Sequence, residues 1–496
     1  MSDITNDKAA AWPSASYRTQ INPDYAGNPF IEALPEVCDD DAAIRSMQRL
    51  IRVTSAERAS PRHERLHLLG RLKDFMQPLD AHVGLFHRMS VAIRRGYVDR
   101  NPADPAFVKQ LLAAVAEMNA ASARPGDAPT RAPIRQRIGA GSGLTLIGHS
   151  GVGKTHAVEA VLRCYGQVVR HSGMTGPLST VFQIVWLKLS VPPDGSIKAL
   201  CIDFFEAIDE LLGTDYVHQF VTRNGTVDKL MVMMGRVSFI HGLGVLVIDE
   251  LQNLNVARSG GAEKMMNFFK QLRDVMKVPL LTIGTPEAIG ILSGDMQVAR
   301  RNSGLEPMER MRHDDQFRFF CESLFDGQFL QAPVELDGET LDVLHDLSQG
   351  IADVVVQLFK LAQDRALSTG EETLSVRLFR DVYDRSMSLM HPFLDDIRGG
   401  RQPRGPNYDK AIEASNAAAF PRTPAPSAVP PGKAAASDAA GPGGVAAKRR
   451  RKPKGEPSGC LLVRVVAEGR GKEISPYDAL AAAGHIRSLG TEALAQ

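Results

Sequence analysis

One short segment of the sequence has the residue types needed to hold a nucleoside triphosphate. Residues 148–155 read Gly-His-Ser-Gly-Val-Gly-Lys-Thr, the spacing of a phosphate-binding loop. The glycines let the backbone turn tightly, so that N–H groups converge on the β-phosphate at the start of a helix. Lys154 then supplies charge to the β- and γ-phosphates, and the Thr155 hydroxyl is a magnesium ligand. The predicted nucleotide-binding residues, for ATP with Mg²⁺, are Gly148, His149, Ser150, Gly151, Val152, Gly153, Lys154 and Thr155.

A second, acidic segment supplies the remaining groups for nucleotide hydrolysis. Val245-Leu-Val-Ile-Asp-Glu250 is an apolar strand that ends in two carboxylates, about one hundred residues after the phosphate loop. We expect Asp249 to hold magnesium, directly or through water, and Glu250 to polarise the attacking water as general base. Apolar strands that end in acids are common, so this prediction depends on the spacing from the loop, which suits the ASCE class of P-loop ATPases. The two motifs predict an enzyme that hydrolyses ATP to ADP and phosphate.

Residues further along the chain match other positions of an AAA+ ATPase site. The strand at 280–285 ends in Thr285, where AAA+ proteins place a polar residue that senses the γ-phosphate; a threonine that only caps the strand is the alternative. Arg300 and Arg301 follow the next helix, where AAA+ rings place an arginine that reaches the neighbouring subunit's γ-phosphate. A solvated basic helix end is the alternative interpretation, and Arg310 is the next candidate for this arginine.

These residues need a sheet that brings the ends of several strands together. Four apolar stretches rich in β-branched residues are strand candidates, and helical stretches separate them. Such alternation predicts a parallel sheet with helices on both faces. The predicted strands are 144–147, 181–189, 245–248 and 280–283, and the predicted helices are near 154–166, 203–213, 228–241 and 262–276.

The predicted fold class is α/β: an AAA+ P-loop NTPase core with a small C-terminal helical lid, a helical N-terminal extension and a disordered C-terminal tail. The extension opens with an extended segment, Asn28–Pro35, before helical patterns around 44–51, 66–76 and 105–121. The lid helix that starts at Ser348 has no arginine near its beginning, so the second-sensor arginine usual in AAA+ lids is not evident. The predicted divisions are 1–135 for the extension, which would dock a partner, 136–335 for the ATPase domain, 336–398 for the lid, 399–459 for a disordered basic linker rich in Pro, Ala and Gly, and 460–496 for a small docking element.

Composition excludes several classes of protein. The 496 residues carry a net charge of +1, so nucleic-acid binding would have to come from local basic patches. The five cysteines are scattered without a CxxC pair, which argues against a disulfide framework or a zinc site. The N-terminus lacks the apolar core of a signal peptide, and no apolar run is long enough for a membrane span. We therefore expect a cytoplasmic protein.

Three features could contact DNA. Residues 448–454 read KRRRKPK, which is either a solubilising cluster in a flexible tail or a set of non-specific phosphate contacts. Lys198 lies in a predicted loop before the helix 203–213, and Arg223 lies in the turn Thr222–Gly225. Both could point into the channel of a ring, and ordinary surface charge is the simpler interpretation of each.

Four passages together resemble the TnsC/TniB group of transposition-regulator ATPases, within the initiator-like AAA+ proteins. The phosphate loop identifies only the superfamily, and the strings DELQN, IGTPEA and SQGIAD point to the group. The long stretch after residue 400 favours the longer TnsC type. The four passages, within residues 28–385, are Asn28–Pro35; residues 148–155; Pro193–Cys201 with Phe204 and Phe205; and Leu246–Asn253 with Ile283–Ala288 and Ser348–Asp353.

The resemblance implies a function. Such proteins bind ATP, assemble into rings or helical filaments around duplex DNA and mark a target site. They link a target selector of the TniQ/TnsD type to transposase subunits of the TnsA/TnsB type, and hydrolysis dismantles the assembly. Lys154, Thr155, Asp249 and Glu250 would form the nucleotide site, which Arg300 or Arg301 of the next subunit would complete.

Two alternative functions remain open. A helicase loader or replication initiator shares the core, but an initiator usually carries a C-terminal winged-helix or helix-turn-helix reader, and a loader usually has a smaller N-terminal unit. A signalling or secretion NTPase that never touches DNA would be favoured by a membrane or peptidoglycan-binding segment. Residues 400–496 show no DNA-reading helix pair of the first kind, and we find no segment of the second kind.

Overall fold

The computed structural model describes residues 12–123, 143–172, 180–221, 225–253, 268–269, 271–272, 275–288 and 302–401. The chain divides into two units, Met1–Arg422 and Thr423–Gln496, and every described residue belongs to the first. Most of the predicted linker and all of the predicted C-terminal docking element therefore lie outside the described residues. Within the described ranges, no helix combines the length and the apolar character needed to cross a membrane.

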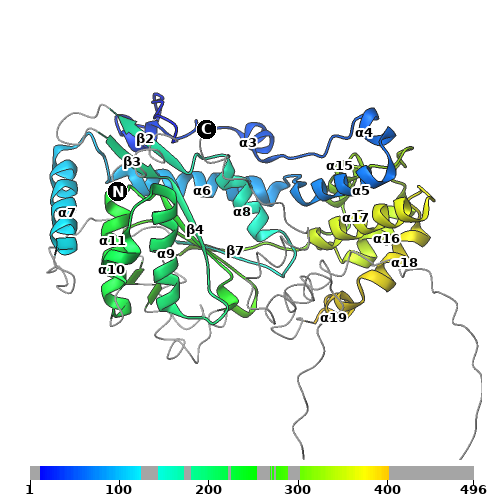
Figure 1. Ribbon diagram of the computed structural model, residues 1–496. Helices are drawn as coiled ribbons and strands as arrows, with labels where there is room; N and C mark the ends of the chain where they lie inside the picture. Colours follow the sequence, from blue (N-terminus) through cyan, green and yellow to red (C-terminus); the bar gives the residue numbers. More distant parts are fainter. Residues whose placement is uncertain are drawn as a thin grey trace, which may run out of the picture. The chain divides into compact units, whose positions relative to one another are not determined.

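A parallel sheet forms the centre of the first unit (Figure 1). Among the described residues it has five strands in the order β4-β5-β6-β1-β7, with every pairing parallel. All residues of β1, β5 and β6 are buried, because helices cover both faces of the sheet. The carboxyl ends of these strands meet at one edge, where the predicted site lies. The strands are β4 Trp186–Ser190, β5 Val245–Asp249, β6 Leu280–Gly284, β1 Gly143–Ile147 and β7 Asn302–Pro307.

The single strand predicted over 181–189 is wrong, because the structure divides it in two. Residues Thr180–Ile184 form β3, which pairs antiparallel with β2, Val168–Ser172, in a separate sheet. After Val185 the chain enters β4 and joins the main sheet. Apolar residues run through both halves, so the sequence pattern does not reveal the change of partner. Strands β2 and β7 are not among the predicted strands.

Helices flank the main sheet, and one of them includes residues that the sequence analysis predicted to form a loop. The predicted helices 154–166, 203–213 and 228–241 correspond to α8, α9 and α11, whereas most of 262–276 lies outside the described residues. Helix α9 begins at Ile197, because the Ser196 hydroxyl accepts a hydrogen bond from the Ala199 N–H and caps it. Lys198 therefore lies in the first turn of a helix, not in a loop. The helices are α8 Lys154–Arg163, α9 Ile197–Leu212, α10 Tyr216–Phe220 and α11 Val227–Ile240.

The N-terminal segment is helical from an earlier point than its sequence pattern predicts. Residues Pro29–Glu32 form the short helix α2 within the predicted extended segment, because Asn28 caps its start and Pro29 fits the first turn. The long helix α6 is not among the predicted helices, although Leu85, Met89 and Ile93 recur at helical spacing. The other elements here are α3 Asp40–Met47, α4 Ser55–Ala59, α5 Arg62–Leu68, the 3-10 helix η1 Leu69–Asp74, α6 Asp80–Val98 and α7 Pro105–Ala123.

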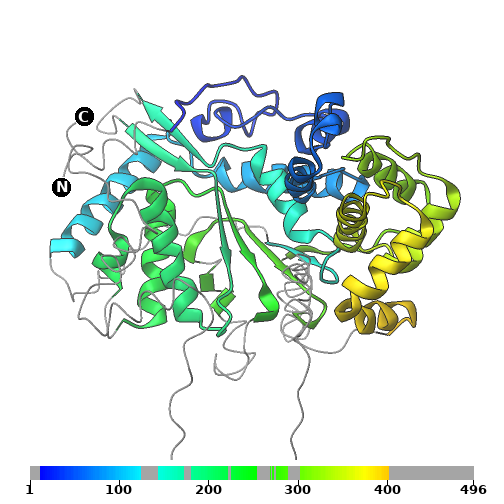
Figure 2. The same cartoon turned by 45° about the vertical axis from the view of Figure 1, so that its right-hand side comes forward.

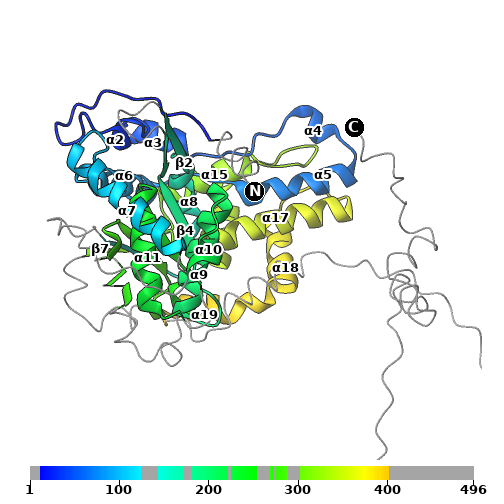
Figure 3. The ribbon, with the colours of Figure 1, turned by 60° about the vertical axis from the view of Figure 1, so that its left-hand side comes forward.

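A helical group follows β7 and packs against the N-terminal segment. Figures 1 and 3 show α5 beside α17, and α17 also contacts η1. The buried Arg65 of α5 makes two hydrogen bonds of 2.6 Å to the two carboxylate oxygens of Glu372, which follows α17. These C-terminal helices thus hold the N-terminal segment by an ion pair as well as by apolar packing. The elements are α15 Asp315–Phe325, α16 Gly338–Ser348, α17 Ala352–Thr369, α18 Val376–Ser386, the 3-10 helix η3 Ser388–Met390 and α19 His391–Arg398.

Candidate nucleotide site

The phosphate loop follows the buried strand β1 and leads directly into α8, as Figure 2 shows from the side of the sheet. Gly151 and Gly153 have φ values of 79° and 97°, a region that favours glycine. Gly148 has a different requirement: a Cβ atom there would lie 2.3 Å from the Met308 carbonyl oxygen. The three glycines are therefore needed for two turns and one close approach between neighbouring strands.

Lys154 lies inside the loop that precedes it. Its ammonium donates hydrogen bonds to the carbonyl oxygens of Gly148 at 2.8 Å and His149 at 2.9 Å, and the residue is only 8% exposed. A buried ammonium can exchange neutral carbonyl partners for phosphate oxygens, which carry full charge and accept stronger hydrogen bonds. The geometry therefore places a cation where the loop's N–H groups would hold a phosphate.

Two motifs that are far apart in sequence meet at the ends of β1 and β5. The Thr155 hydroxyl donates a hydrogen bond of 2.9 Å to Oδ2 of Asp249, which is 3% exposed. Lys188, on β4, places its ammonium 3.4 Å from the same oxygen and 2.5 Å from Oε1 of Glu159. A hydroxyl and a carboxylate side by side are hard oxygen ligands of the type that Mg²⁺ prefers when phosphates and water supply the rest. The side chains present therefore fit a magnesium ion.

Glu250 has a strained backbone and a defined partner. Its φ of 60° lies in the left-handed region, which is uncommon for a residue with a side chain. Its carboxylate accepts a hydrogen bond of 2.5 Å from the side-chain amide of Gln252. The amide oxygen of Gln252 in turn accepts the backbone N–H of Thr285 at 3.3 Å. One side chain thus connects the ends of β5 and β6.

The Thr285 hydroxyl is buried and has no hydrogen-bond partner in the part of the chain that the structure describes. The residue is 7% exposed, and its Oγ1 finds no hydrogen-bond partner among the described residues. Buried hydroxyls are normally satisfied, so an orphaned one at the edge of a cavity indicates a place for a ligand or a water molecule. This hydroxyl lies where a γ-phosphate sensor is predicted.

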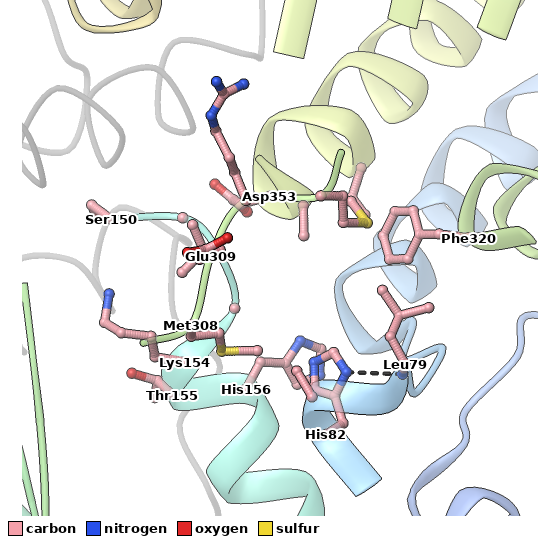
Figure 4. Close-up of a pocket in the computed structure, with 18 of the residues that line it drawn as sticks. Leu79, His82, Ser150, Lys154, Thr155, His156, Met308, Glu309, Phe320 and Asp353 are labelled. Atoms are coloured by element: carbon pink, nitrogen blue, oxygen red, sulfur yellow. Dashed lines mark hydrogen bonds between the residues drawn. The ribbon is translucent and has the colours of Figure 1, made fainter. Parts of the chain in front are cut away.

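These groups line one end of a cavity of about 720 Å³. Figure 4 shows Ser150, Lys154 and Thr155 at the polar end, with Leu79 and Phe320 at the other. The far end is formed by the segment 72–82, before and at the start of α6, and by α15, so it combines parts of the chain that are far apart in sequence. No local sequence signal predicts these lining residues, because each belongs to a segment with its own apolar pattern.

Two histidines of the apolar end are uncharged at neutral pH. His82 accepts a hydrogen bond from the Leu79 N–H through Nδ1, and burial lowers its pKa to about 4. Burial also lowers the pKa of His156 on α8. These two histidines therefore add no positive charge to the apolar end, which suits a neutral, flat group.

The start of α17 contacts the phosphate loop directly. The Asp353 N–H donates a hydrogen bond of 3.0 Å to the Gly151 carbonyl, and burial raises the pKa of the Asp353 carboxyl. This helix starts at Ala352, so the predicted start at Ser348 is wrong; Gln349 and Gly350 instead form a left-handed turn before it. Arg310 lines the cavity and donates a hydrogen bond of 3.0 Å to the Gln349 carbonyl.

The structure brings some predicted site residues together and leaves others untested. Residues 148–155, Asp249, Glu250 and Thr285 line or adjoin one cavity, whereas Lys198 is not among its lining residues. Lys188 and Gln252 are two polar residues beside Asp249 and Glu250 that the sequence analysis missed. Gln252 lies within the DELQN string, which was a local signal. The predicted residues outside the described ranges are Arg223, Arg300, Arg301 and 448–454.

Comparisons with known proteins agree with this architecture. A family model described as an AAA domain matches residues 137–292, which contain the phosphate loop and the acidic end of β5. The match, the parallel sheet and the flanking helices establish an AAA+ P-loop fold. No curated protein sequence matches the chain.

Solved structures that are similar to this chain include ORC and Cdc6 proteins. The Aeropyrum pernix ORC1 protein in complex with DNA is 19% identical, with a TM-score of 0.36 over 58% of this chain and 70% of that one. The Cdc6p of Pyrobaculum aerophilum is 14% identical, with a TM-score of 0.32 over 64% and 86% of the two chains. The Drosophila ORC bound to DNA is 11% identical, with a TM-score of 0.31 over 84% of each chain. At identities and TM-scores this low, the likenesses support no functional conclusion for this chain.

Proposed function

We propose that this chain is an ATPase in which residues 148–155 bind the phosphates and Glu250 acts as general base. The observation that carries the proposal is the meeting of Lys154, Thr155 and Asp249 in one cavity, with the Thr155–Asp249 hydrogen bond joining two distant motifs. Lys154 exchanges its carbonyl partners for phosphate oxygens, and the N–H groups of the loop bind the β-phosphate. Thr285 binds the γ-phosphate or the attacking water through its hydroxyl, which has no hydrogen-bond partner among the described residues.

Magnesium binding follows from the same pair of ligands. Thr155 and Asp249 would hold the ion, which would supply positive charge to the β- and γ-phosphate oxygens as charge develops on them. The base of the nucleotide occupies the apolar end, between the segment 72–82 and α15, where the two neutral histidines add no competing charge.

Completion of the site by a second subunit is part of the proposal. Arg300 or Arg301 of a neighbouring copy stabilises charge on the γ-phosphate in the transition state, which makes hydrolysis depend on assembly. Arg310 is the alternative, and it lines the cavity of its own subunit. Mixing Glu250→Gln subunits with Arg300→Ala/Arg301→Ala subunits tests this. ATP hydrolysis restored in the mixture supports an arginine that acts between subunits. If each variant alone is inactive and the mixture is inactive too, the result contradicts it.

At the level of the whole protein, we propose a regulator of DNA transposition. ATP-bound copies assemble on duplex target DNA and link a TniQ/TnsD-type target selector to the transposase, and hydrolysis releases the assembly. The support is the set of sequence passages quoted above, of which DELQN and SQGIAD now lie at the cavity: Gln252 bonds to Glu250, and Asp353 bonds to the phosphate loop. The N-terminal helices dock the selector, and Lys198 and Arg223 contribute to DNA binding.

One experiment separates the two levels of the proposal. Binding to a random-sequence duplex is measured with ATP, ADP or no nucleotide over a salt series, for wild type, Lys154→Ala and the exposed-surface control Lys229→Ala, with negative-stain microscopy of the complexes. ATP-dependent, salt-sensitive rings or filaments lost only in Lys154→Ala support DNA-directed assembly. ATP hydrolysis without DNA binding in any nucleotide state would leave an ATPase and favour a protein-directed switch, the alternative function.

The salt dependence of DNA binding tests the residues that are proposed to contact DNA. If Lys198 and Arg223 each contact a phosphate, their substitution by alanine lowers the slope of log affinity against log salt by about one per contact. An unchanged slope in both variants would remove them from the DNA interface.

A further inference from the structure

One ammonium group lies between two carboxylates beside the proposed magnesium ligands. Lys188 is on β4, and its side chain lies on the opposite face of the strand from the buried Leu187 and Leu189. Its Nζ donates a hydrogen bond of 2.5 Å to Oε1 of Glu159 on α8 and lies 3.4 Å from Oδ2 of Asp249 on β5. The two carboxylates therefore share one cation.

The two carboxylates differ in how much water reaches them. The side chain of Asp249 is 4% exposed, whereas that of Glu159 is 42% exposed. Interactions between charges are stronger where water is excluded, so the ammonium has the larger electrostatic effect at Asp249. Glu159 also has a second cation, because Nη1 of Arg163 lies 3.9 Å from its Oε2. Lys188 thus neutralises mainly Asp249, although its hydrogen bond goes to Glu159.

The ammonium of Lys188 and a divalent cation would compete for the same carboxylate oxygen. Oδ2 of Asp249 is the oxygen that faces the other proposed ligand, the Thr155 hydroxyl, at 2.9 Å. Oδ1 instead accepts the backbone N–H of Glu250 at 2.9 Å. A divalent cation at Oδ2 would bring two like charges together in a site with little water. The lysine side chain is flexible, so its ammonium can turn away from Asp249 and keep its bond to Glu159.

We propose that Lys188 is a positioning residue that competes with the divalent cation for Asp249, and that Glu159 receives its ammonium when the metal binds. Lys188 lowers the affinity of Asp249 for a divalent cation. Glu159 raises that affinity, because it offers the displaced ammonium another carboxylate. This inference rests on the proposed function, since it concerns the metal ligands assigned there, and it adds two residues that set how tightly the site binds metal.

Four substitutions separate these roles. Lys188→Met removes the charge at nearly constant length, and Lys188→Arg keeps the charge. Glu159→Gln keeps the shape of the second carboxylate and removes its charge. Arg163→Met is the matched control, because it removes a cation from Glu159 and leaves the one beside Asp249 in place. Thermal unfolding of each variant shows that it is folded at the temperature of the binding measurement.

The test measures metal binding itself with Mn²⁺, which takes the same oxygen ligands as Mg²⁺. Free Mn²⁺ is counted by electron paramagnetic resonance during titration of the nucleotide-free protein and of its complex with ADP. We expect the Kd for Mn²⁺ to fall about tenfold or more in Lys188→Met and to rise about threefold or more in Glu159→Gln. Lys188→Arg and Arg163→Met should stay within about threefold of wild type.

The direction of each change decides the outcome. A lysine with a merely structural role would loosen the site when removed and weaken Mn²⁺ binding, which is the opposite of the expected result. A Kd that is unchanged or higher in Lys188→Met, or unchanged or lower in Glu159→Gln, would overturn the proposal. In an Asp249→Asn background Lys188→Met should no longer tighten binding, because the charge for which the two cations compete is absent.

ATP hydrolysis by wild type and Lys154→Ala, measured in parallel, keeps the two proposals distinguishable. If hydrolysis depends on Lys154 and Lys188→Met does not tighten Mn²⁺ binding, only the role of Lys188 is rejected. If no hydrolysis depends on Lys154 and Asp249→Asn binds Mn²⁺ as wild type does, both proposals fail.

Discussion

The ammonium of Lys188 lies 3.4 Å from Oδ2 of Asp249, the oxygen that also accepts the Thr155 hydroxyl. The register of the parallel strands brings them together, since β4 pairs with β5 and Ser190 lies opposite Asp249. A lysine thus supplies a positive charge beside the carboxylate assigned to magnesium. In this structure the buried carboxylate is balanced by the protein's own cation.

Replacing Lys188 should make the stability of the folded protein depend more on bound magnesium. In Lys188→Met the 3%-exposed Asp249 loses its countercharge, which we expect to cost on the order of 2 kcal/mol of unfolding free energy without Mg²⁺. Thermal unfolding with and without Mg²⁺ and ATP measures this: the ligands should raise Tm by more in the variant than in wild type. Lys229→Met, on the exposed face of α11, is the control, and equal ligand-induced shifts in both variants would contradict the prediction.

Removing the Thr285 hydroxyl should separate activity from stability. Thr285→Val deletes a buried hydroxyl that has no partner among the described residues, so the unfolding free energy should be unchanged or higher. Hydrolysis should fall about 10- to 100-fold, since a group that binds the γ-phosphate or water is lost. Chemical denaturation and ATPase assays check both, and Thr285→Ser should keep most of the activity. A marked loss of stability in Thr285→Val would indicate a structural role instead.

A methyl group at Gly148 should disrupt the phosphate loop. The added Cβ would lie 2.3 Å from the Met308 carbonyl oxygen, which belongs to the segment after the neighbouring strand β7. We expect Gly148→Ala to weaken nucleotide binding at least about tenfold and to lower Tm. Gly166→Ala is the control, because nothing lies within 4 Å of its added Cβ. Titration with a fluorescent nucleotide measures the affinity of each variant. A wild-type affinity in Gly148→Ala would show that the two strands separate easily to make room for the methyl group.

The ion pair between Arg65 and Glu372 should give a stability that depends on pH. Hydrogen bonding to Arg65 holds the pKa of Glu372 below its ordinary value of 4.5. A carboxyl with a lowered pKa in the folded state stabilises the protein above its unfolded pKa, and this contribution is lost as pH falls through the folded pKa. Glu372→Gln should therefore cost about 2 kcal/mol near neutral pH, and the difference from wild type should shrink in acid below about pH 4.5.

Urea unfolding at several pH values measures that difference. The control is Glu371→Gln at the adjacent, exposed residue, and its unfolding free energy should equal that of wild type at every pH. If the difference in unfolding free energy between wild type and Glu372→Gln stays constant from neutral to acid pH, the charge of Glu372 does not contribute to stability.

Much of the polar half of the cavity could be predicted from the sequence. The phosphate loop and the pair Asp249–Glu250 are each contiguous in the chain, so short-range spacing and an apolar strand pattern are enough to find them. Thr285 could be predicted in the same way, because it directly follows the apolar pattern of strand β6. The central strands β1, β5 and β6 were predictable for a related reason, because complete burial makes each a continuous apolar run.

The sequence by itself determined the class of chemistry, since the loop glycines, Lys154, Thr155 and the two acids carry their roles in their order along the chain. Only the tertiary structure decided what surrounds them. Strand register placed Lys188 beside Asp249, the turn after β5 aimed Gln252 at both Glu250 and Thr285, and the packing of α6 and α15 closed the apolar end. Such contacts join residues from separate segments, and no local pattern records them because the partner of each side chain is set by the fold.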